Sequence, residues 1–129
     1  MTGVQTCALP ISAQNAGTLR CRILAEGANG PTTPDADAVI DQRDDIFVIP
    51  DILCNSGGVI VSYFEWVQDL QRLFWTEAEV NDRLVRLLGQ AFAQVTRRAQ
   101  SERISNRTSA MAIGVAKVHA GKQLRGLFP

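Results

Sequence analysis

Residues 25–68 read AEGANGPTTPDADAVIDQRDDIFVIPDILCNSGGVIVSYFEWVQ, and this stretch decides the fold. It joins two short apolar runs, residues 21–25 and residues 46–49, and each run stops at a turn that carries an asparagine. The second run has almost no polar alternation, which is typical of a parallel strand covered on both faces. Ligands of open α/β sheets bind beyond the carboxyl ends of the strands. We therefore predict that Asn29 and Asn55 lie on a ligand-binding edge.

A helix is predicted between the two runs. Thr33, Pro34 and Asp35 supply an N-cap, a proline at the first helical position and an acid in the first turn. The helix is expected to run to about Arg43. A strand, a helix and a second strand in this order form a crossover unit with parallel strands. Two strands do not make a stable sheet, so the rest of the sheet is expected to lie outside this chain.

Three long helices are predicted after the second strand. Residues 52–72 place apolar side chains at helical spacing. A capping box at residues 76–79 opens the next helix, which is expected to reach Arg103. Residues 106–108 are expected to break this helix, and a last helix that ends by Gly121 is expected to follow.

Gly57 and Gly58 fall in the opening turns of the first long helix. Each glycine destabilises a helix by about 1 kcal/mol relative to alanine, so something must require the missing side chains. Close approach of a flat ligand is one explanation. Tight packing of the helix on a neighbouring strand is the other.

Four arginines form a basic cluster near the end of the second long helix: Arg97, Arg98, Arg103 and Arg107. Such a cluster could hold a phosphate. Charged runs of this kind are more typical of the solvated face of a helix, and we interpret the cluster in that way.

Length and composition limit the classes of protein. A chain of 129 residues allows one compact domain. Thirteen basic side chains balance thirteen acidic ones, so neither nucleic acid nor a membrane is expected as a partner. No apolar run approaches the roughly 18 to 20 residues that a bilayer span needs. Three cysteines without CxxC spacing argue against a disulfide framework and a metal site, and favour a cytoplasmic location.

The first twelve residues, MTGVQTCALPIS, share no periodicity with the rest of the chain. They contain neither a signal-peptide core nor an arginine-rich amphipathic face. We interpret residues 1–12 as a non-native leader and expect the native protein to begin well upstream.

Two segments, EGANGPTTPDAD (residues 26–37) and PDILCNSGGVIVSYFEWVQ (residues 50–68), resemble the amino-acid dehydrogenases that act on glutamate, leucine, phenylalanine and valine. The glutamate dehydrogenase branch matches best, and the resemblance extends over residues 14–129. It implies that residues 13–50 complete a Rossmann-like, dinucleotide-binding α/β domain, with two parallel strands and a crossover helix. Residues 51–129 would be the carboxyl-terminal helical segment of the same domain.

The resemblance also implies a site. NAD or NADP would be the cofactor of the parent enzyme, glutamate and 2-oxoglutarate its substrates, and a homohexamer its assembly. Asn29 would meet the ribose on the nicotinamide side, Asn55 the nicotinamide amide, and Ser62 the side-chain carboxylate of glutamate. An amide donates and accepts, as a carboxamide requires, and a hydroxyl donates to a carboxylate. The residues alone allow a turn asparagine, a helix cap and a hydroxyl bonded to its own helix.

The groups that carry out the reaction are expected outside this chain. In glutamate dehydrogenases the carboxylate-binding lysines, the catalytic aspartate and the phosphate-binding turn precede the matching segment. This chain has no lysine before Lys117 and no GxGxxG turn. We therefore expect it to hold no catalytic residue and to be inactive alone. Two alternatives stay open: a helical interaction module that docks through residues 80–99, and a dehydrogenase of an apolar amino acid.

Overall fold

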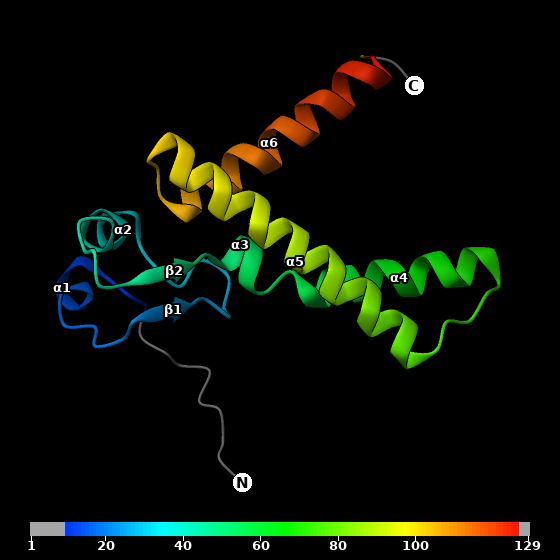
Figure 1. The fold of residues 1–129 in the computed structure, drawn as a ribbon, viewed down its shortest axis with the longest axis horizontal. Coiled ribbons are helices and arrows are strands. Elements are labelled where there is room, and N and C mark those ends of the chain that lie inside the picture. Colours follow the sequence, from blue (N-terminus) through cyan, green and yellow to red (C-terminus); the bar gives the residue numbers. More distant parts are fainter. Residues whose placement is uncertain (1–9, 127–129) are drawn as a thin grey trace, which may run out of the picture.

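The structure, a computed structural model, describes residues 10–126. In Figure 1 the two strands and two short helices form one end of the molecule, and three long helices extend away from it. The elements in chain order are α1 (Ala13–Ala16), β1 (Ile23–Ala25), α2 (Pro34–Ile40), β2 (Phe47–Ile49), α3 (Asp51–Cys54), α4 (Gly57–Gln71), α5 (Glu77–Glu102) and α6 (Asn106–Arg125). The predicted α/β class, with a crossover unit followed by three long helices, is confirmed.

The strands pair in parallel, with Leu24 opposite Val48 at the centre of the register. Helix α2 makes the crossover: the Thr33 side chain accepts from the amide of Ala36, and Pro34 occupies the first turn. The sheet end has its own small core, formed by the buried residues Ala16, Ala36, Ile40 and Ile46. Because the crossover through α2 returns the chain, β1 and β2 run in the same direction and their carboxyl ends lie at the same edge.

A second core joins α3, α5 and α6. Leu53, Val95 and Ala110 are buried together. Next to them Ser109 is fully buried, and its Oγ donates to the carbonyl of Val95 over 2.8 Å. Helix α6 is thereby fixed against α5, and α3 follows β2 directly, so the helices and the strand edge share one frame.

Helix α4 contacts Trp75, which lies just before α5 and packs under Arg83 of that helix. The rings of Phe64 and Trp75 meet edge to face with centroids 5.6 Å apart. The Trp75 amide donates to Oε1 of Gln68 over 2.6 Å, and the guanidinium of Arg83 lies 4.1 Å from the centroid of the Trp75 ring. These contacts set the direction of α4.

The predicted continuous helix over residues 52–72 was wrong, because the chain forms two helices that are separated at Asn55 and Ser56. The Ser56 Oγ donates to the carbonyl of Leu53 over 2.8 Å. Short polar side chains of this type compete with helical hydrogen bonding, and the following glycine pair has low helix propensity. Asn55 therefore lies between α3 and α4, outside both helices.

The predicted break at residues 106–108 was also wrong. Arg103, in the left-handed conformation with φ 53°, ends α5. Ser105 then caps α6, and its side chain accepts from the amide of Thr108. Residues 106–108 are therefore the first turn of α6, and this helix continues past Gly121.

Part of the predicted leader takes part in the fold. The Ile11 amide donates to the carbonyl of Pro31 over 2.7 Å, and Ile11 forms a parallel bridge with Thr32. Ser12 is the N-cap residue of α1. Residues 1–9 of that leader lie outside the described residues.

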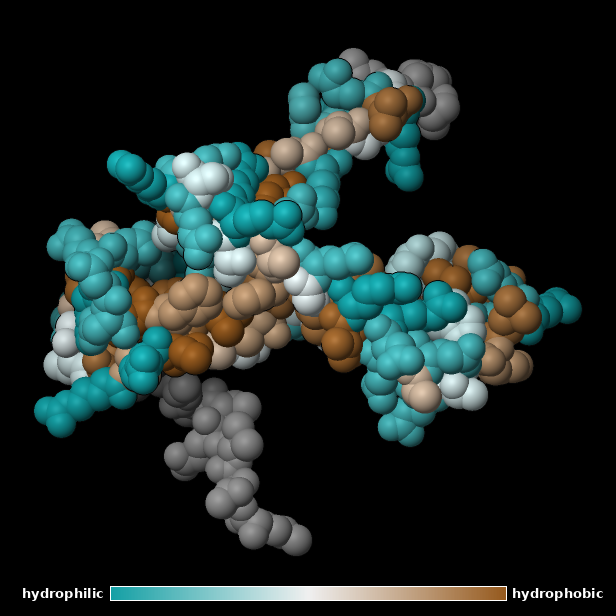
Figure 2. Space-filling model, viewed as in Figure 1, coloured by the Kyte–Doolittle hydropathy of each residue, from teal (hydrophilic) through white to brown (hydrophobic). Residues whose placement is uncertain are grey.

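Large apolar side chains remain exposed on α4 and just after it. Figure 2 shows apolar, brown residues over the strands and along α4 and α6. Exposed apolar surface of this extent is typical of an interface. The exposed residues on α4 and just after it include Val59, Tyr63, Trp66, Leu70 and Phe74.

None of the helices in the described part of the chain has the length and apolar character that a membrane span requires.

The capping box of α5 predicts a measurable loss of stability in Thr76→Ala. The Thr76 side chain accepts from the Glu79 amide, and Glu79 Oε2 accepts from the Thr76 amide over 2.7 Å. The substitution should lower the free energy of unfolding by about 1 kcal/mol in a urea titration followed by circular dichroism. Ser101→Ala is the matched control, because among the described residues Ser101 bonds only the carbonyl of Arg98 in its own helix. Equal losses in the two variants would contradict the capping role.

Candidate functional site at the carboxyl edge of the strands

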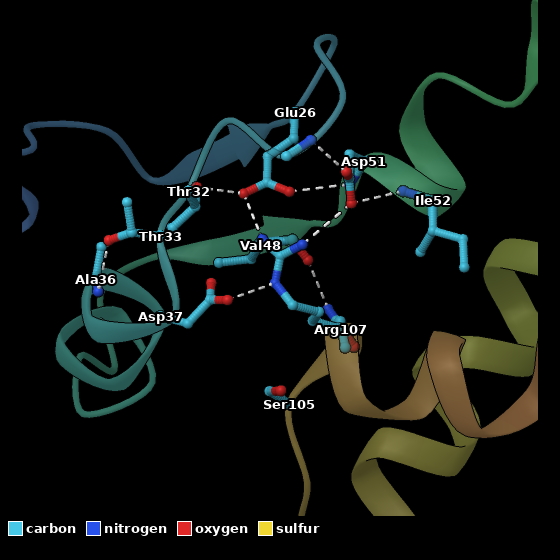
Figure 3. Close-up of polar contacts among 12 residues, drawn as sticks. Glu26, Thr32, Thr33, Ala36, Asp37, Val48, Asp51, Ile52, Ser105 and Arg107 are labelled. Atoms are coloured by element: carbon cyan, nitrogen blue, oxygen red, sulfur yellow. Dashed lines mark hydrogen bonds and ion pairs between the residues drawn. The ribbon is translucent and has the colours of Figure 1, made fainter. Parts of the chain in front are cut away.

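Two carboxylates stand where the strands end. Glu26 directly follows β1, and Asp51 begins α3 two residues after β2. Glu26 is only 3% exposed, so its charge needs partners within the protein. Its Oε1 accepts from Thr32 Oγ1 over 2.6 Å and from Arg107 Nη2, and its Oε2 accepts from the Asp51 amide over 2.9 Å (Figure 3).

Asp51 fixes the loop that follows β1. Its Oδ2 accepts from the Gly30 amide over 2.8 Å. Gly30 has φ +58°, a left-handed conformation that glycine adopts without steric cost. The other oxygen, Oδ1, accepts from the Ile52 amide over 2.8 Å and from Arg107 Nη1 over 3.1 Å. One carboxylate therefore connects the loop after β1, the start of α3 and the arginine.

Arg107, in the first turn of α6, forms ion pairs with three acids. Besides Glu26 and Asp51, its Nε lies 2.9 Å from Oδ2 of Asp37 on α2. Its side chain is 23% exposed. The prediction that Arg107 belongs to a solvated basic face was therefore wrong. The informative signal was the pair of acids close after the two apolar runs, because an acid buried there requires a cation.

The neighbouring residue adds a direct tie to the sheet. Asn106 Nδ2 donates to the carbonyl of Val48 in β2 over 2.8 Å. The start of α6 is thus bonded to a strand as well as to both strand-end loops. We call the group Glu26, Asp37, Asp51 and Arg107 the ion cluster.

Burial, hydrogen bonds and neighbouring charges shift the pKa values of three members of the ion cluster, Asp37, Asp51 and Arg107. The hydrogen bond from the Gly30 amide, with further help from the Ile52 amide and Arg107, lowers the pKa of Asp51 in spite of partial burial. Burial raises the pKa of Asp37, and Arg107 offsets this only in part. For Arg107, burial opposes the charge, but the hydrogen bond and charge of Glu26, together with Asp37, raise its pKa.

The structure brings the two predicted asparagines into contact. Asn55 Nδ2 donates to Asn29 Oδ1 over 2.6 Å. Asn29 precedes Gly30, and Asn55 follows α3, so both lie within a few residues of groups that Asp51 holds. The side chain of Asn55 bonds across to the other loop and does not cap a helix amide. The roles of both residues toward a cofactor stay predictions.

The amide pair keeps hydrogen-bonding capacity. Their mutual bond leaves Asn29 Nδ2 as a donor and Asn55 Oδ1 as an acceptor, and neither makes a hydrogen bond within residues 10–126. Asn29 is exposed at the edge. A free amide nitrogen can donate and a free amide oxygen can accept a further hydrogen bond.

Ser62 lies on α4, one and a half turns into the helix, and it is exposed. Its hydroxyl makes no hydrogen bond with any group in the described part of the chain, so the alternative of a hydroxyl bonded to its own helix is not supported. Its role toward a substrate stays a prediction.

The glycine pair opens the face of α4 that precedes Ser62. A Cβ at Gly57 would make only ordinary contact, 3.8 Å from Cδ1 of Leu88. A Cβ at Gly58 would meet no atom within 4 Å. Within residues 10–126, tight packing on a strand does not explain the pair, and close approach of a ligand stays a prediction.

The site offers polar side chains for contacts and, among the described residues, no metal-binding group. Across residues 10–126 no three His, Cys, Asp or Glu side chains are grouped so as to hold a metal ion. The acids of the ion cluster are engaged by Arg107 and by backbone amides, so they act as structural anchors. The exposed groups are the amides and the hydroxyl.

Comparison with known proteins identifies the class. The family model for Glutamate/Leucine/Phenylalanine/Valine dehydrogenase matches residues 6–126, so the chain belongs to this family of amino-acid dehydrogenases. The match includes residues 6–12 of the predicted leader. The resemblance to this family, stated from two sequence segments, is confirmed.

The relatives within the family are glutamate dehydrogenases. The chain is 43% identical to the glutamate dehydrogenase of Thermotoga maritima over 92% of its own length and 28% of the relative. It is 40% identical to the cryptic catabolic NAD-specific glutamate dehydrogenase of Bacillus subtilis, over 90% of the chain and 27% of the relative. The chain thus spans little more than a quarter of the relatives it matches.

Solved structures agree. Glutamate dehydrogenase from Peptoniphilus asaccharolyticus superposes with a TM-score of 0.82 at 37% identity, covering 92% of this chain and 30% of that one. The hetero-hexameric glutamate dehydrogenase of Thermus thermophilus, in a leucine-bound form, gives a TM-score of 0.83 at 32% identity, covering 91% and 28%. These matches confirm the Rossmann-like α/β assignment.

The shifted pKa of Asp51 predicts how stability depends on pH. Because folding lowers this pKa below its ordinary value of 3.8, the carboxylate stabilises the fold fully above that value and loses its contribution as pH falls through the lower, folded value. Asp51→Asn should lower the free energy of unfolding by about 2 kcal/mol at pH 7. The gap between variant and parent should shrink below pH ~4. Urea titrations from pH 3 to pH 7 measure it, and a gap that is constant with pH would contradict the prediction.

Proposed function

We propose that this chain is the carboxyl-terminal part of a glutamate dehydrogenase. The whole enzyme would interconvert L-glutamate with 2-oxoglutarate and ammonia, using NAD or NADP. The observation that carries the proposal is the Asn29–Asn55 hydrogen bond at the carboxyl edge of two parallel strands. The family match supports the reaction class, and the NAD-specific relative from Bacillus subtilis favours NAD.

Oxidative deamination requires the α-carbon of the amino acid to lie against a hydride acceptor, with the carboxylates held and protons shuttled. The bound nicotinamide ring supplies the acceptor. In our proposal Asn29 binds the ribose on the nicotinamide side and Asn55 binds the carboxamide. Their free donor and acceptor fit this ligand chemistry. The ring would then lie with one face toward the substrate.

Ser62 is the proposed contact to the substrate in this chain. Its hydroxyl is exposed on α4, beyond the open space at Gly58. It would donate to the side-chain carboxylate of glutamate and so favour glutamate over an apolar amino acid. The lysines and the aspartate of the resemblance would come from the preceding part of the polypeptide.

The organisation and assembly follow the same proposal. Residues 13–50 would end the dinucleotide-binding domain, and residues 51–129 would form its helical segment. The exposed apolar side chains of α4 supply surface for contacts with the remainder of the enzyme. A homohexamer is proposed, and the hetero-hexameric Thermus thermophilus structure supports a related assembly. The free thiols of Cys21 and Cys54 suit a cytoplasmic location.

Completing the gene tests the reaction. The full-length protein should reduce NAD or NADP in the presence of glutamate, whereas the purified 129-residue chain should give no glutamate-dependent reduction. Absorbance at 340 nm over a panel of amino acids measures both. Turnover by the chain alone would contradict the proposal that the catalytic groups lie outside it. A full-length preference for leucine or valine would favour an apolar amino-acid dehydrogenase, and no turnover at all would favour a helical interaction module.

Ser62→Ala in the full-length protein tests the substrate contact. Loss of one hydrogen bond to a carboxylate should raise KM for glutamate by about tenfold or more. KM for leucine should change little, because leucine has no carboxylate at that end. Ser101→Ala, an exposed serine on α5, serves as the control. Equal changes for glutamate and leucine would remove Ser62 from the substrate site.

A further inference from the structure

The ion cluster is a poor device for stability alone. Removing charges from water has a free-energy cost that ion pairing returns only with good geometry, and well-packed apolar residues often do as well. Here three acids surround one guanidinium, so the charges do not even balance. What such a cluster achieves well is a defined geometry, because each charge must keep its partners.

The bonds of the cluster lead directly to the amide pair. Arg107 donates to Asp51 Oδ1, and the other oxygen of Asp51 accepts from the amide of Gly30. Gly30 is bonded covalently to Asn29. On the other side, Asp51 starts the four-residue helix α3, and Asn55 follows directly after it. Both amides are therefore anchored through the same carboxylate.

Arg107 clamps this carboxylate against a second one. It also donates to Glu26, and Glu26 accepts from the Asp51 amide over 2.9 Å. The two strand-end loops thus share one planar, forked cation (Figure 3). A lysine ammonium is a point charge and does not reproduce this two-armed bridge.

We propose that Arg107 is a positioning residue for the nicotinamide end of the cofactor. From the first turn of α6 it fixes Glu26 and Asp51, and through them it holds Asn29 and Asn55 at bonding distance. This inference rests on the proposed function. It goes further because it assigns to a residue of the last helix an effect on the nicotinamide half of the cofactor alone. The phosphates would be bound elsewhere, since the chain carries no GxGxxG turn for them.

The test compares two ligands on the full-length protein. Isothermal calorimetry with NADH and with ADP measures binding with and without the nicotinamide end. Arg107→Met should weaken NADH by about tenfold and change ADP less than about twofold, because only the nicotinamide side loses its support. Arg98→Met is the matched control, since within residues 10–126 Arg98 pairs only with Glu102 on its own helix. It should leave both affinities unchanged.

Two further variants guard against a misfolded protein. Arg107→Lys keeps the positive charge and should show the same selective loss. Asp37→Asn removes the third ion pair of Arg107 but leaves its bonds to Glu26 and Asp51, so any change in the ratio of NADH to ADP affinity should be smaller than in Arg107→Met. Thermal unfolding of each variant is measured in parallel. If Arg107→Met does not fold, Arg107→Lys decides.

The outcomes separate the two proposals. Equal losses for NADH and ADP, or no loss for either, would overturn the positioning role of Arg107 while leaving the enzyme assignment intact. A parent protein that binds NADH no more tightly than ADP and does not oxidise glutamate would instead overturn the proposed function. A selective loss in Arg107→Met and Arg107→Lys, absent from Arg98→Met, supports the inference.

Discussion

One guanidinium sets the geometry of the site. Parallel strands bring two chain segments to the same edge, but each then continues into a loop whose course the sheet does not determine. Arg107 joins these loops by bonding the acid at the start of each, Glu26 and Asp51. Because Asn106 also bonds the carbonyl of Val48, the last helix is fixed to the strand edge at its first turn. Elements far apart in sequence thereby form one rigid frame.

The sequence predicted those parts of the fold that depend on local chemistry. The apolar run before Pro50, the cap at Thr33 and the capping box at Thr76 are signals carried by adjacent residues, and each marks a real element. The break at Asn55 and the start of α6 were missed. At both places short polar side chains bond neighbouring backbone groups, and apolar spacing does not record this choice.

The candidate site was predictable to the same degree. Asn29 and Asn55 could be found because each follows a strand, and parallel pairing brings the two turns together. The ion cluster was not found, because Arg107 stands 81 residues from Glu26 and resembles any other arginine of a charged helix. This long-range ion pair leaves a trace in the sequence only on the acid side, where a carboxylate directly follows the apolar run of β1. The position of Glu26 directly after this run is the feature that implies a cationic partner.

The mutual bond of the two asparagines has a consequence for recognition. Each side-chain amide uses one of its groups in this bond, which ties the two loops together and leaves Asn29 Nδ2 and Asn55 Oδ1 without a partner within residues 10–126. In the proposed roles, the Asn55 oxygen would accept from the nicotinamide carboxamide and the Asn29 amide would donate to the ribose, with little rearrangement of either loop. Selectivity would follow from the proposed roles, since a carboxylate in place of the carboxamide presents only acceptors where the Asn55 oxygen needs a donor.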